Sequence, residues 1–303
     1  VDDLVAIWLL RRNLRFRLRI DTGQVRTLIG AALPLGLVMV INSLYFKIDA
    51  VLLSLLAEDA AVALYGVAYR IFEMALPLSA YIMVTLLPEL ARLEVDDPRF
   101  GRLVQYAFTM MSLIALPLGA FALCAPEIMT VIGGAAYAQG ANVLVLVMIS
   151  LALATVNGVF GWALVSQGRQ GVLLKVSVAV LVVNVGLNLL LIPAYGVTGT
   201  GMALVATELL SLVATAVVFG RQIQLPRPHR PVRTVLAGAG MAAGVSVKFL
   251  IDLPALATLA LAGAVGITCY GVALWALGAV PPAVRQALRD LVGPRLRRAA
   301  DAA

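Results

Sequence analysis

The chain has 303 residues, of which 62% are hydrophobic and only 13% charged, and its formal net charge is +7. Soluble domains contain about 25% charged residues, so this composition excludes an ordinary water-soluble fold and indicates an integral membrane protein. The positive charge does not predict a nucleic-acid partner, because basic loops are explained by membrane topology and by contacts with anionic lipids.

Eight apolar stretches follow one another along the chain. Each has about 20 residues or more, enough to cross about 30 Å of hydrocarbon as a helix. The runs are continuous rather than alternating, which favours helices over the strands of a membrane barrel. We therefore expect an all-α integral membrane protein with spans at roughly 25–56, 62–90, 103–124, 140–165, 172–192, 199–220, 232–250 and 255–279.

The connectors between these spans alternate in charge. Of the 23 Lys and Arg residues, 20 lie in five clusters, at 11–26, 92–102, 169–175, 221–233 and 285–298. The connectors between the clusters contain no Lys or Arg and carry Glu58, Asp59, Glu127 and Asp252. Basic loops of polytopic proteins face the cytoplasm, so the pattern places the N-terminal linker and the C-terminal tail on the cytoplasmic side.

A loop rich in Pro and Arg interrupts the apolar pattern after six spans. It divides the chain into four predicted parts: the end of a preceding helix with a basic linker at 1–24, a six-helix unit at 25–220, the loop at 221–231, and a helix pair with a basic tail at 232–303. Residues 4–10 are apolar and are followed by Arg11 and Arg12, so we expect a further N-terminal portion to precede this sequence.

Lys47 and Arg70 lie inside predicted spans, away from the basic clusters. Lys47 is about 14 Å from the end of its helix at Leu56, and Arg70 about 12 Å from Val62, so the two cations reach similar depth. A charge at the centre of a bilayer costs about 2.5–3.5 kcal/mol. Both side chains are therefore expected to face protein or a water-filled cavity.

Two interpretations of these cations remain open. Arg70 and Glu73 are spaced i, i+3 and could neutralise each other, because charges inside membranes usually pair. Alternatively, Arg70, Lys47, Glu73 and Tyr69 line a cationic cavity for an anionic headgroup, since Arg donates two parallel hydrogen bonds to phosphate. Asp49 is a weaker candidate ligand, because it lies about 200° from Lys47 around a regular helix.

A second polar set occurs in the later spans. Asn184 and Asn188 are spaced i, i+4, and Glu208 lies about 14 Å inside its helix. Because loss of hydration disfavours a charged carboxylate, Glu208 could accept a proton that drives transport. The alternative is structural, with interhelical hydrogen bonds of about 0.6 kcal/mol each, and the sequence favours that interpretation.

The sequence contains no recognisable catalytic or metal-binding arrangement. His229 is the single histidine, and the acids do not cluster on a loop, so we predict neither catalytic residues, nor a metal site, nor a cofactor beyond a proton or sodium as coupling ion. A membrane enzyme such as a glycan polymerase or acyltransferase is disfavoured, because the predicted outer connectors are short and contain neither His nor Arg.

Two passages resemble a known family. Ile48-Asp49, the segment from Val62 to Arg70 and Pro88 are similar to the opening of the second lobe in bacterial lipid-linked oligosaccharide flippases. The segment from Asn184 through Pro193, Gly196 and Gly199 to Ala203 resembles the helix-turn-helix pattern of the same family. These proteins belong to the multidrug/oligosaccharidyl-lipid/polysaccharide exporter (MOP) superfamily, which also includes drug/cation antiporters and peptidoglycan-precursor flippases.

The resemblance implies a MATE-like fold in which this chain supplies the second six-helix lobe and two extra helices. It also implies a multi-pass protein of the bacterial inner membrane that flips an undecaprenyl-diphosphate-linked oligosaccharide for surface polysaccharide biosynthesis by ion-coupled alternating access. By position, Arg70 and Lys47 would face the diphosphate, and Asp49 matches a frequent family acid. The implied partners are the lipid-linked oligosaccharide, membrane lipids and, further, a polysaccharide polymerase; the alternatives are a cation antiporter and a peptidoglycan-precursor flippase.

Overall fold

The computed structural model describes residues 22–221, 231–251 and 253–279, and within these ranges it contains helices and no strands. Six long helices come first in the chain. They are α2 (Thr22–Leu56), α3 (Asp59–Arg92), α4 (Pro98–Phe121), α6 (Ala141–Ser166), α7 (Gln170–Tyr195) and α8 (Val197–Gly220). The last pair is α9 (Pro231–Val245), continued by the 3-10 helix η3 (Ser246–Phe249), and α10 (Ala255–Ala276). The all-α membrane fold predicted from the sequence is confirmed.

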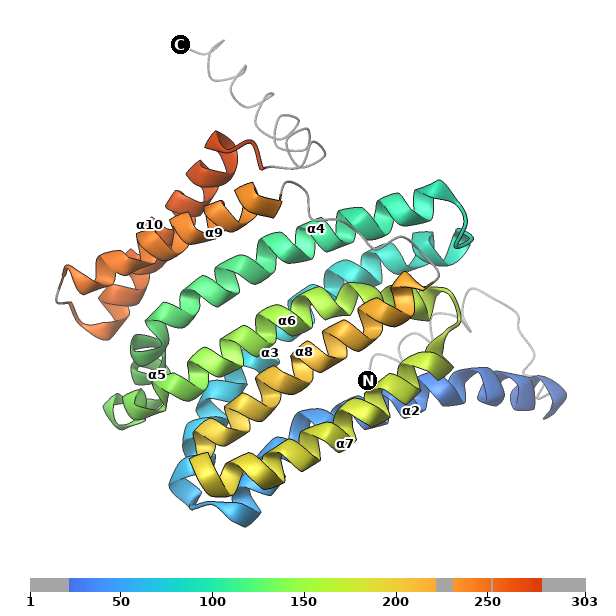
Figure 1. The fold of residues 1–303 in the computed structure, drawn as a ribbon, viewed down its shortest axis with the longest axis horizontal. Helices are drawn as coiled ribbons and strands as arrows, with labels where there is room; N and C mark the ends of the chain where they lie inside the picture. The colour runs from blue at the N-terminus through green and yellow to red at the C-terminus, as the bar shows by residue number, and fades with distance from the viewer. Residues whose placement is uncertain (1–21, 222–230, 252, 280–303) are drawn as a thin grey trace, which may run out of the picture.

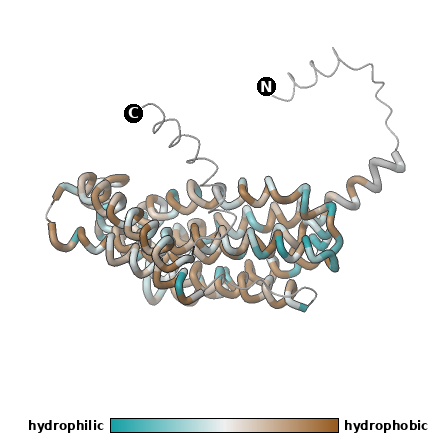
Figure 2. Tube along the Cα trace, turned by 90° about the horizontal axis from the view of Figure 1, so that it is seen from above, coloured by the Kyte–Doolittle hydropathy of each residue, from teal (hydrophilic) through white to brown (hydrophobic). Residues whose placement is uncertain are grey.

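The long helices lie side by side in a bundle (Figure 1). Helix α6 packs between α4 and α8, and α8 also contacts α7. Helix α2 lies against α7, and α3 lies against α6. The α9–α10 hairpin packs on α4 and on α5 (Ala125–Gly133). Apolar residues run along the tubes, and hydrophilic residues gather toward one end of the bundle (Figure 2).

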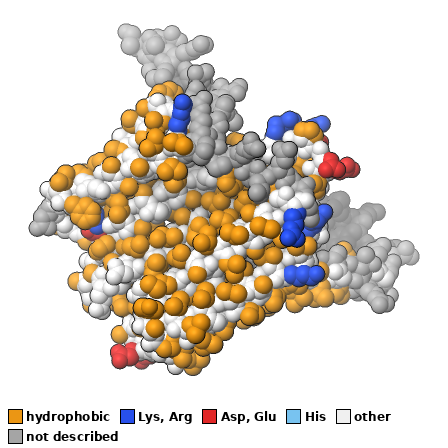
Figure 3. All heavy atoms as spheres, viewed as in Figure 1, with side chains coloured by type: hydrophobic (Ala, Val, Ile, Leu, Met, Phe, Trp, Pro, Cys, Tyr) orange, Lys and Arg blue, Asp and Glu red, His pale blue; other side chains and the backbone are white. Residues whose placement is uncertain are grey.

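Charge separates the two ends of this bundle. One end, here called the basic end, carries Arg92, Arg99, Arg169 and Lys175 around the α3–α4 and α6–α7 connectors. The opposite end, here called the acidic end, carries Glu58 and Asp59 at the α2–α3 turn. Between the ends, orange apolar side chains cover the face seen in Figure 3, with charged atoms at its margins. A bilayer is the solvent that suits such a surface.

Seven helices of the described ranges are long and apolar enough to cross a membrane. The predicted span at 232–250 is the exception, because α9 is a 15-residue α-helix whose last turn tightens into η3. The predicted connector between the spans at 103–124 and 140–165 is largely helical. It forms α5 and the 3-10 helix η2 (Ala135–Gly140), and η1 (Ala122–Cys124) joins α5 to α4.

The turn between α7 and α8 explains the glycines of the second family-like passage. Gly196 has φ +56, a left-handed conformation that favours glycine, and its N–H donates to the Ile192 carbonyl at 2.8 Å. A Cβ atom added to Gly199 would lie 2.2 Å from the Leu191 carbonyl oxygen. These two glycines therefore allow α7 and α8 to reverse direction with almost no loop.

The described residues cover most of the predicted six-helix unit and helix pair. The linker at 1–21, the loop at 222–230 and the tail at 280–303, including His229, lie outside them. The four-part division of the chain therefore stays a prediction.

Candidate functional site

The charges predicted inside the first two spans form one cluster, here called the charged cluster. The Lys47 ammonium on α2 donates to Glu73 on α3, and the Arg70 guanidinium lies 3.5 Å from the other oxygen of the same carboxylate. Two cations therefore share one acid. The Lys47 and Arg70 side chains are 67% and 66% exposed, while that of Glu73 is 32% exposed.

A pocket of about 430 Å³, here called the surface pocket, lies beside this cluster between α2 and α3. Lys47, Glu73 and Tyr69 line it, together with Pro77. The Tyr69 ring stacks between Tyr65 and Phe72, with 5.3 Å between centroids on each side, and its hydroxyl has no hydrogen-bond partner among the residues described. Three predicted site residues thus meet at one pocket.

Arg70 and Asp49 are placed differently from these three. Arg70 reaches Glu73 but does not line the surface pocket. Asp49 is fully buried on the opposite side of α2 from Lys47, as the helical spacing predicted. Its carboxylate accepts from Asn188 Nδ2 at 2.8 Å and from the Tyr65 hydroxyl at 3.2 Å.

Asp49 is one end of a chain of contacts, here called the buried network. Asn188 Nδ2 also donates to the Asn184 carbonyl at 3.0 Å, and Asn184 Nδ2 donates to Thr207 Oγ1 at 3.4 Å. Asn188 Oδ1 is buried without a partner in the described part of the chain. The network therefore joins α2, α3, α7 and α8 through polar atoms and leaves one acceptor unused.

Glu208 lies at the other end of the buried network. The Tyr45 hydroxyl lies 3.0 Å from both Glu208 Oε1 and Thr207 Oγ1. Glu208 is 3% exposed and Asp49 0%, and neither carboxylate forms an ion pair with a Lys or Arg of the described ranges. Acids inside a membrane usually pair with cations, but Asp49 and Glu208 accept hydrogen bonds from hydroxyl and amide groups instead.

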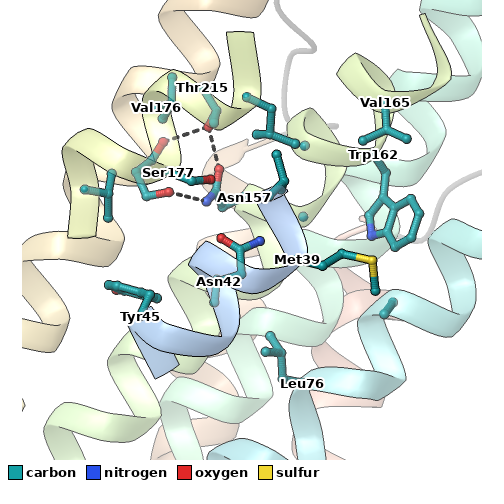
Figure 4. A pocket seen from close by; sticks show the side chains of 18 of the residues that line it. Met39, Asn42, Tyr45, Leu76, Asn157, Trp162, Val165, Val176, Ser177 and Thr215 are labelled. Carbon is teal, nitrogen blue, oxygen red and sulfur yellow. Dashed lines mark hydrogen bonds between the residues drawn. The ribbon is translucent and has the colours of Figure 1, made fainter. Parts of the chain in front are cut away.

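The buried network ends at a cavity of about 390 Å³, here called the interhelical cavity, between α2, α3, α6, α7 and α8 (Figure 4). Polar side chains project into it from several helices. They are Asn42, Tyr45, Ser79, Asn157, Ser177, Glu208, Ser211 and Thr215. Among the described residues that line it there is no Lys or Arg, and Glu208 is the single charged one. The cavity therefore differs in charge from the surface pocket.

Sequence reasoning missed several of these groups. Tyr45, Thr207, Asn42 and Asn157 were not singled out, although Tyr45 and Asp49 are spaced i, i+4, and so share a helix face. An isolated hydroxyl or amide within an apolar run has no distinctive pattern, so Asn42 and Asn157 carried no signal. No group of three His, Cys, Asp or Glu that could hold a metal occurs in the ranges described.

A second ion pair ties the C-terminal helix pair to the bundle. Lys248 Nζ, on η3, donates to both carboxylate oxygens of Glu127 on α5 at 2.8 and 2.9 Å. The structure buries the Lys248 side chain to 4% exposure, because α5 is a helix that carries Glu127 beneath α9 and α10.

A family model described as "Polysaccharide biosynthesis protein" matches residues 1–94 of the chain. This segment includes Lys47, Asp49, Arg70 and Glu73. No curated protein sequence is significantly similar to the chain.

Three solved structures share the fold. The chain is similar to the lipid II flippase MurJ in an inward closed conformation, with TM-score 0.70 and 11% identity over 90% of this chain and 60% of that one. It is also similar to an outward-facing multidrug resistance MATE transporter of the MOP superfamily, with TM-score 0.57 and 16% identity. A MOP superfamily transporter from Pyrococcus furiosus, whose binding pocket is described as having reverse polarity, gives 0.51 and 19%. Each of the last two matches covers 82% of this chain and 63% of the other.

The predicted resemblance is therefore confirmed at the level of fold and family model. The chain is a multi-pass membrane protein with the fold of MOP superfamily transporters. It spans about 60% of the length of these structures.

Proposed function

We propose that this chain is part of a flippase that moves an undecaprenyl-diphosphate-linked oligosaccharide to the outer leaflet of the bacterial inner membrane for surface polysaccharide biosynthesis. The family model supports a role in polysaccharide biosynthesis. The activity is that of the whole transporter, because the chain spans about 60% of the lipid II flippase it resembles. The role is transport rather than catalysis.

The charged cluster is the observation that carries this proposal. Lys47 and Arg70 provide two positive charges against the single negative charge of Glu73. No described residue covers the two cations, and apolar lipid is a costly neighbour for them. This face therefore suits a water-filled hollow in which the excess positive charge meets an anionic headgroup.

A diphosphate matches the donors that this face offers. The guanidinium of Arg70 has more donors than Glu73 can occupy, and its planar fork fits two phosphate oxygens. In the proposed complex, Lys47 and Arg70 contact the diphosphate, and Glu73 holds both cations in place when the site is empty.

The buried network is the proposed coupling element. Asp49, Asn184, Asn188 and Thr207 bring a carboxylate, two side-chain amides and a hydroxyl together, and no cationic side chain of the described ranges pairs with them. Oxygen atoms are the ligands that hard cations prefer, and a buried carboxylate can also take a proton. Occupancy by a proton or sodium would change the packing of α2 against α7 and α8, and thus the orientation of the charged cluster.

The basic end is the proposed cytoplasmic end, by the positive-inside rule. Alternating access would then present the charged cluster first to the cytoplasmic leaflet and afterwards to the outer one. Pro34 in α2 and Pro77 in α3 remove backbone hydrogen bonds, and they are the proposed flex points. A polysaccharide polymerase is the proposed partner that receives the flipped lipid.

Two alternatives share this fold. A peptidoglycan-precursor flippase would use the same diphosphate chemistry, so the charged cluster supports it equally. A cation antiporter is favoured by one observation, the interhelical cavity with Glu208 and no Lys or Arg. The excess positive charge at Lys47 and Arg70 opposes it, because organic cations would be repelled from that face.

The test is to introduce Lys47→Gln and Arg70→Gln into the full-length transporter and to measure surface polysaccharide in cells. Each change removes a charge-assisted hydrogen bond of about 1.5–3 kcal/mol, so we expect output to fall about tenfold or more. Arg92→Gln is the matched control, because Arg92 forms an i, i+3 pair with Glu89 on the same helix.

Wild-type polysaccharide output from both cluster variants would contradict the proposed headgroup site. A peptidoglycan role predicts normal polysaccharide with accumulation of the peptidoglycan lipid precursor, and an antiporter role predicts altered resistance to organic cations with both lipid pools unchanged.

A further inference from the structure

The interhelical cavity extends from the buried network toward the basic end of the bundle. Its lining on α6 runs from Ala154 to Val165, a length of about 16 Å along the helix axis. Val165 is next to the last residue of α6, and Leu173 is in the first turn of α7. The cavity thus connects the level of Glu208 with the level of the α6–α7 connector.

Several polar groups in this cavity lack protein partners. The side chains of Asn42 and Ser177 line it and form no hydrogen bond with other described residues. Glu208 Oε1 accepts from Tyr45, whereas Oε2 receives no donor within the described ranges. Asn157 is held by Ser211 and Thr215 on α8. Buried polar groups are normally satisfied by protein or water, so a cavity with such a lining is suited to hold water.

We propose that the interhelical cavity is a water-filled route along which the coupling cation passes between the basic end and Glu208 with the buried network. This inference rests on the proposed function, because it supplies the access path of the proposed coupling element. The ion is a proton or a small inorganic cation. The charge of the lining selects for it, since Glu208 is the single charged residue among the described residues of the lining.

The last part of the route is a chain of polar groups at hydrogen-bond distance, made of hydroxyl and carboxylate oxygens and of the two Asn side-chain amides. From Glu208 it passes to the Tyr45 hydroxyl at 3.0 Å and to Thr207 Oγ1 at 3.0 Å. Thr207 lies 3.4 Å from Asn184, and Asn188 joins that side to Asp49 at 2.8 Å. Glu208 is thus the first acid that an ion meets on entering, and Asp49 is the last.

The surface pocket does not compete for this role. The interhelical cavity and the surface pocket share Phe46, Leu76 and Ala80 as a common wall. These apolar side chains separate the cavity that contains Glu208 from the pocket that contains Lys47. The coupling cation and the anionic headgroup would therefore bind in separate compartments of opposite charge.

The test measures whether a thiol in the cavity is in water. In the full-length transporter with Cys124→Ala and Cys269→Ala, single cysteines are placed at Ser177 and Gly161, which line the cavity, and at Val178, which does not. Membrane vesicles of each orientation receive a small, cationic, membrane-impermeant methanethiosulfonate. Thiolates form in water but not in lipid, so Ser177→Cys and Gly161→Cys should react about tenfold or more faster than Val178→Cys, from the basic end only.

A plug variant makes the test specific. Gly158 lines the cavity, and a Cβ added there meets nothing within 4 Å, so Gly158→Leu is the variant chosen to fill the cavity. We expect it to slow labelling of Ser177→Cys about tenfold. Gly119→Leu, on α4 and outside the cavity, also meets nothing within 4 Å and should leave labelling unchanged.

Equal labelling of Ser177→Cys, Gly161→Cys and Val178→Cys would overturn the route, as would labelling that the plug does not slow. Labelling needs no transport, so its outcome is independent of polysaccharide output. If labelling fails while Arg70→Gln still lowers output, only the route is wrong. If labelling succeeds while Arg70→Gln has no effect, the headgroup site is wrong and the cavity stands.

Discussion

Two ion clusters occupy opposite parts of this bundle and differ in what surrounds them. In the charged cluster on α2 and α3, Lys47 and Arg70 are about two-thirds exposed and share Glu73. In the second cluster, Lys248 and Glu127 are 4% and 21% exposed and form a pair of one cation and one acid. The charged cluster has a net positive charge and is not covered by the described residues. The Lys248–Glu127 pair is neutral and largely buried.

The difference shows that depth in a span does not by itself distinguish a functional charge from a structural one. A balanced, enclosed pair has no donor left for a ligand, and its role is to hold α9, η3 and α10 against α5. An unbalanced cluster retains positive charge and free donors, which a ligand can use. The predictions below test this distinction through stability and transport separately.

The largest expected effect on stability comes from Lys248→Met. It leaves the partly buried Glu127 without its cation, and breaking a fully buried ion pair from one side costs about 3–5 kcal/mol, which is the upper bound here. Thermal unfolding of the purified protein in detergent should therefore shift downward. The double variant Lys248→Met/Glu127→Gln removes both charges and should recover most of the loss. An unchanged melting temperature in the single variant would mean that the pair does not fasten the helix hairpin.

Asp49→Leu should have the next largest effect. Asp49 faces the interior of the bundle, and its removal leaves the Tyr65 hydroxyl without its acceptor, at about 1–3 kcal/mol for an unsatisfied buried group. Asn188 Nδ2 loses its bond to Asp49 and keeps the one to the Asn184 carbonyl. Asp49→Asn keeps an acceptor oxygen and should unfold near the wild-type temperature while transport loses its dependence on the ion gradient. Gradient-dependent transport by a well-folded Asp49→Asn would exclude this acid from coupling.

Lys47→Gln should change stability by less than about 1 kcal/mol, because exposed ion pairs contribute little. Its effect should appear in transport alone, as the expected drop in polysaccharide output. Comparison of its unfolding temperature with that of Lys248→Met, in the same detergent, separates the two clusters. A loss of stability as large as that of Lys248→Met would assign the charged cluster a structural role.

Arg92→Gln should have the smallest effect. Its side chain is 79% exposed at the basic end and lies 3.9 Å from Glu89, a pairing geometry similar to that of Arg70 and Glu73. We expect neither the unfolding temperature nor transport to change. This result would show that an i, i+3 ion pair on α3 affects transport only where it lies beside the surface pocket.

The sequence predicted the long helices well, because continuous apolar runs and the alternation of charged connectors are strong, local signals. It failed where tertiary contacts decide the structure. The segment at 126–139 was predicted only as a connector between two spans, yet it folds into α5 and η2 beneath the helix hairpin. The pairing of Lys248 with Glu127 depends on this fold, because α5 carries Glu127 toward η3.

The candidate site was predictable in part. Helical spacing alone placed Lys47 and Asp49 on opposite faces of α2, and it placed Arg70 beside Glu73. It did not reveal that Lys47 would reach the same carboxylate across two helices. Nor could spacing show that Asn188 would meet Asp49, 139 positions away, because such pairing depends on how α2 packs on α7.

The central claim is that Lys47 and Arg70 bind the diphosphate of a lipid-linked sugar, and binding tests it most directly. The measurement is the affinity of the purified full-length transporter for undecaprenyl diphosphate in detergent, for wild type, Lys47→Gln/Arg70→Gln and Arg92→Gln. We predict that the double variant binds at least about tenfold more weakly, since each lost charge-assisted bond contributes about 1.5–3 kcal/mol, and that Arg92→Gln binds like wild type. Equal affinity in all three proteins would contradict the account.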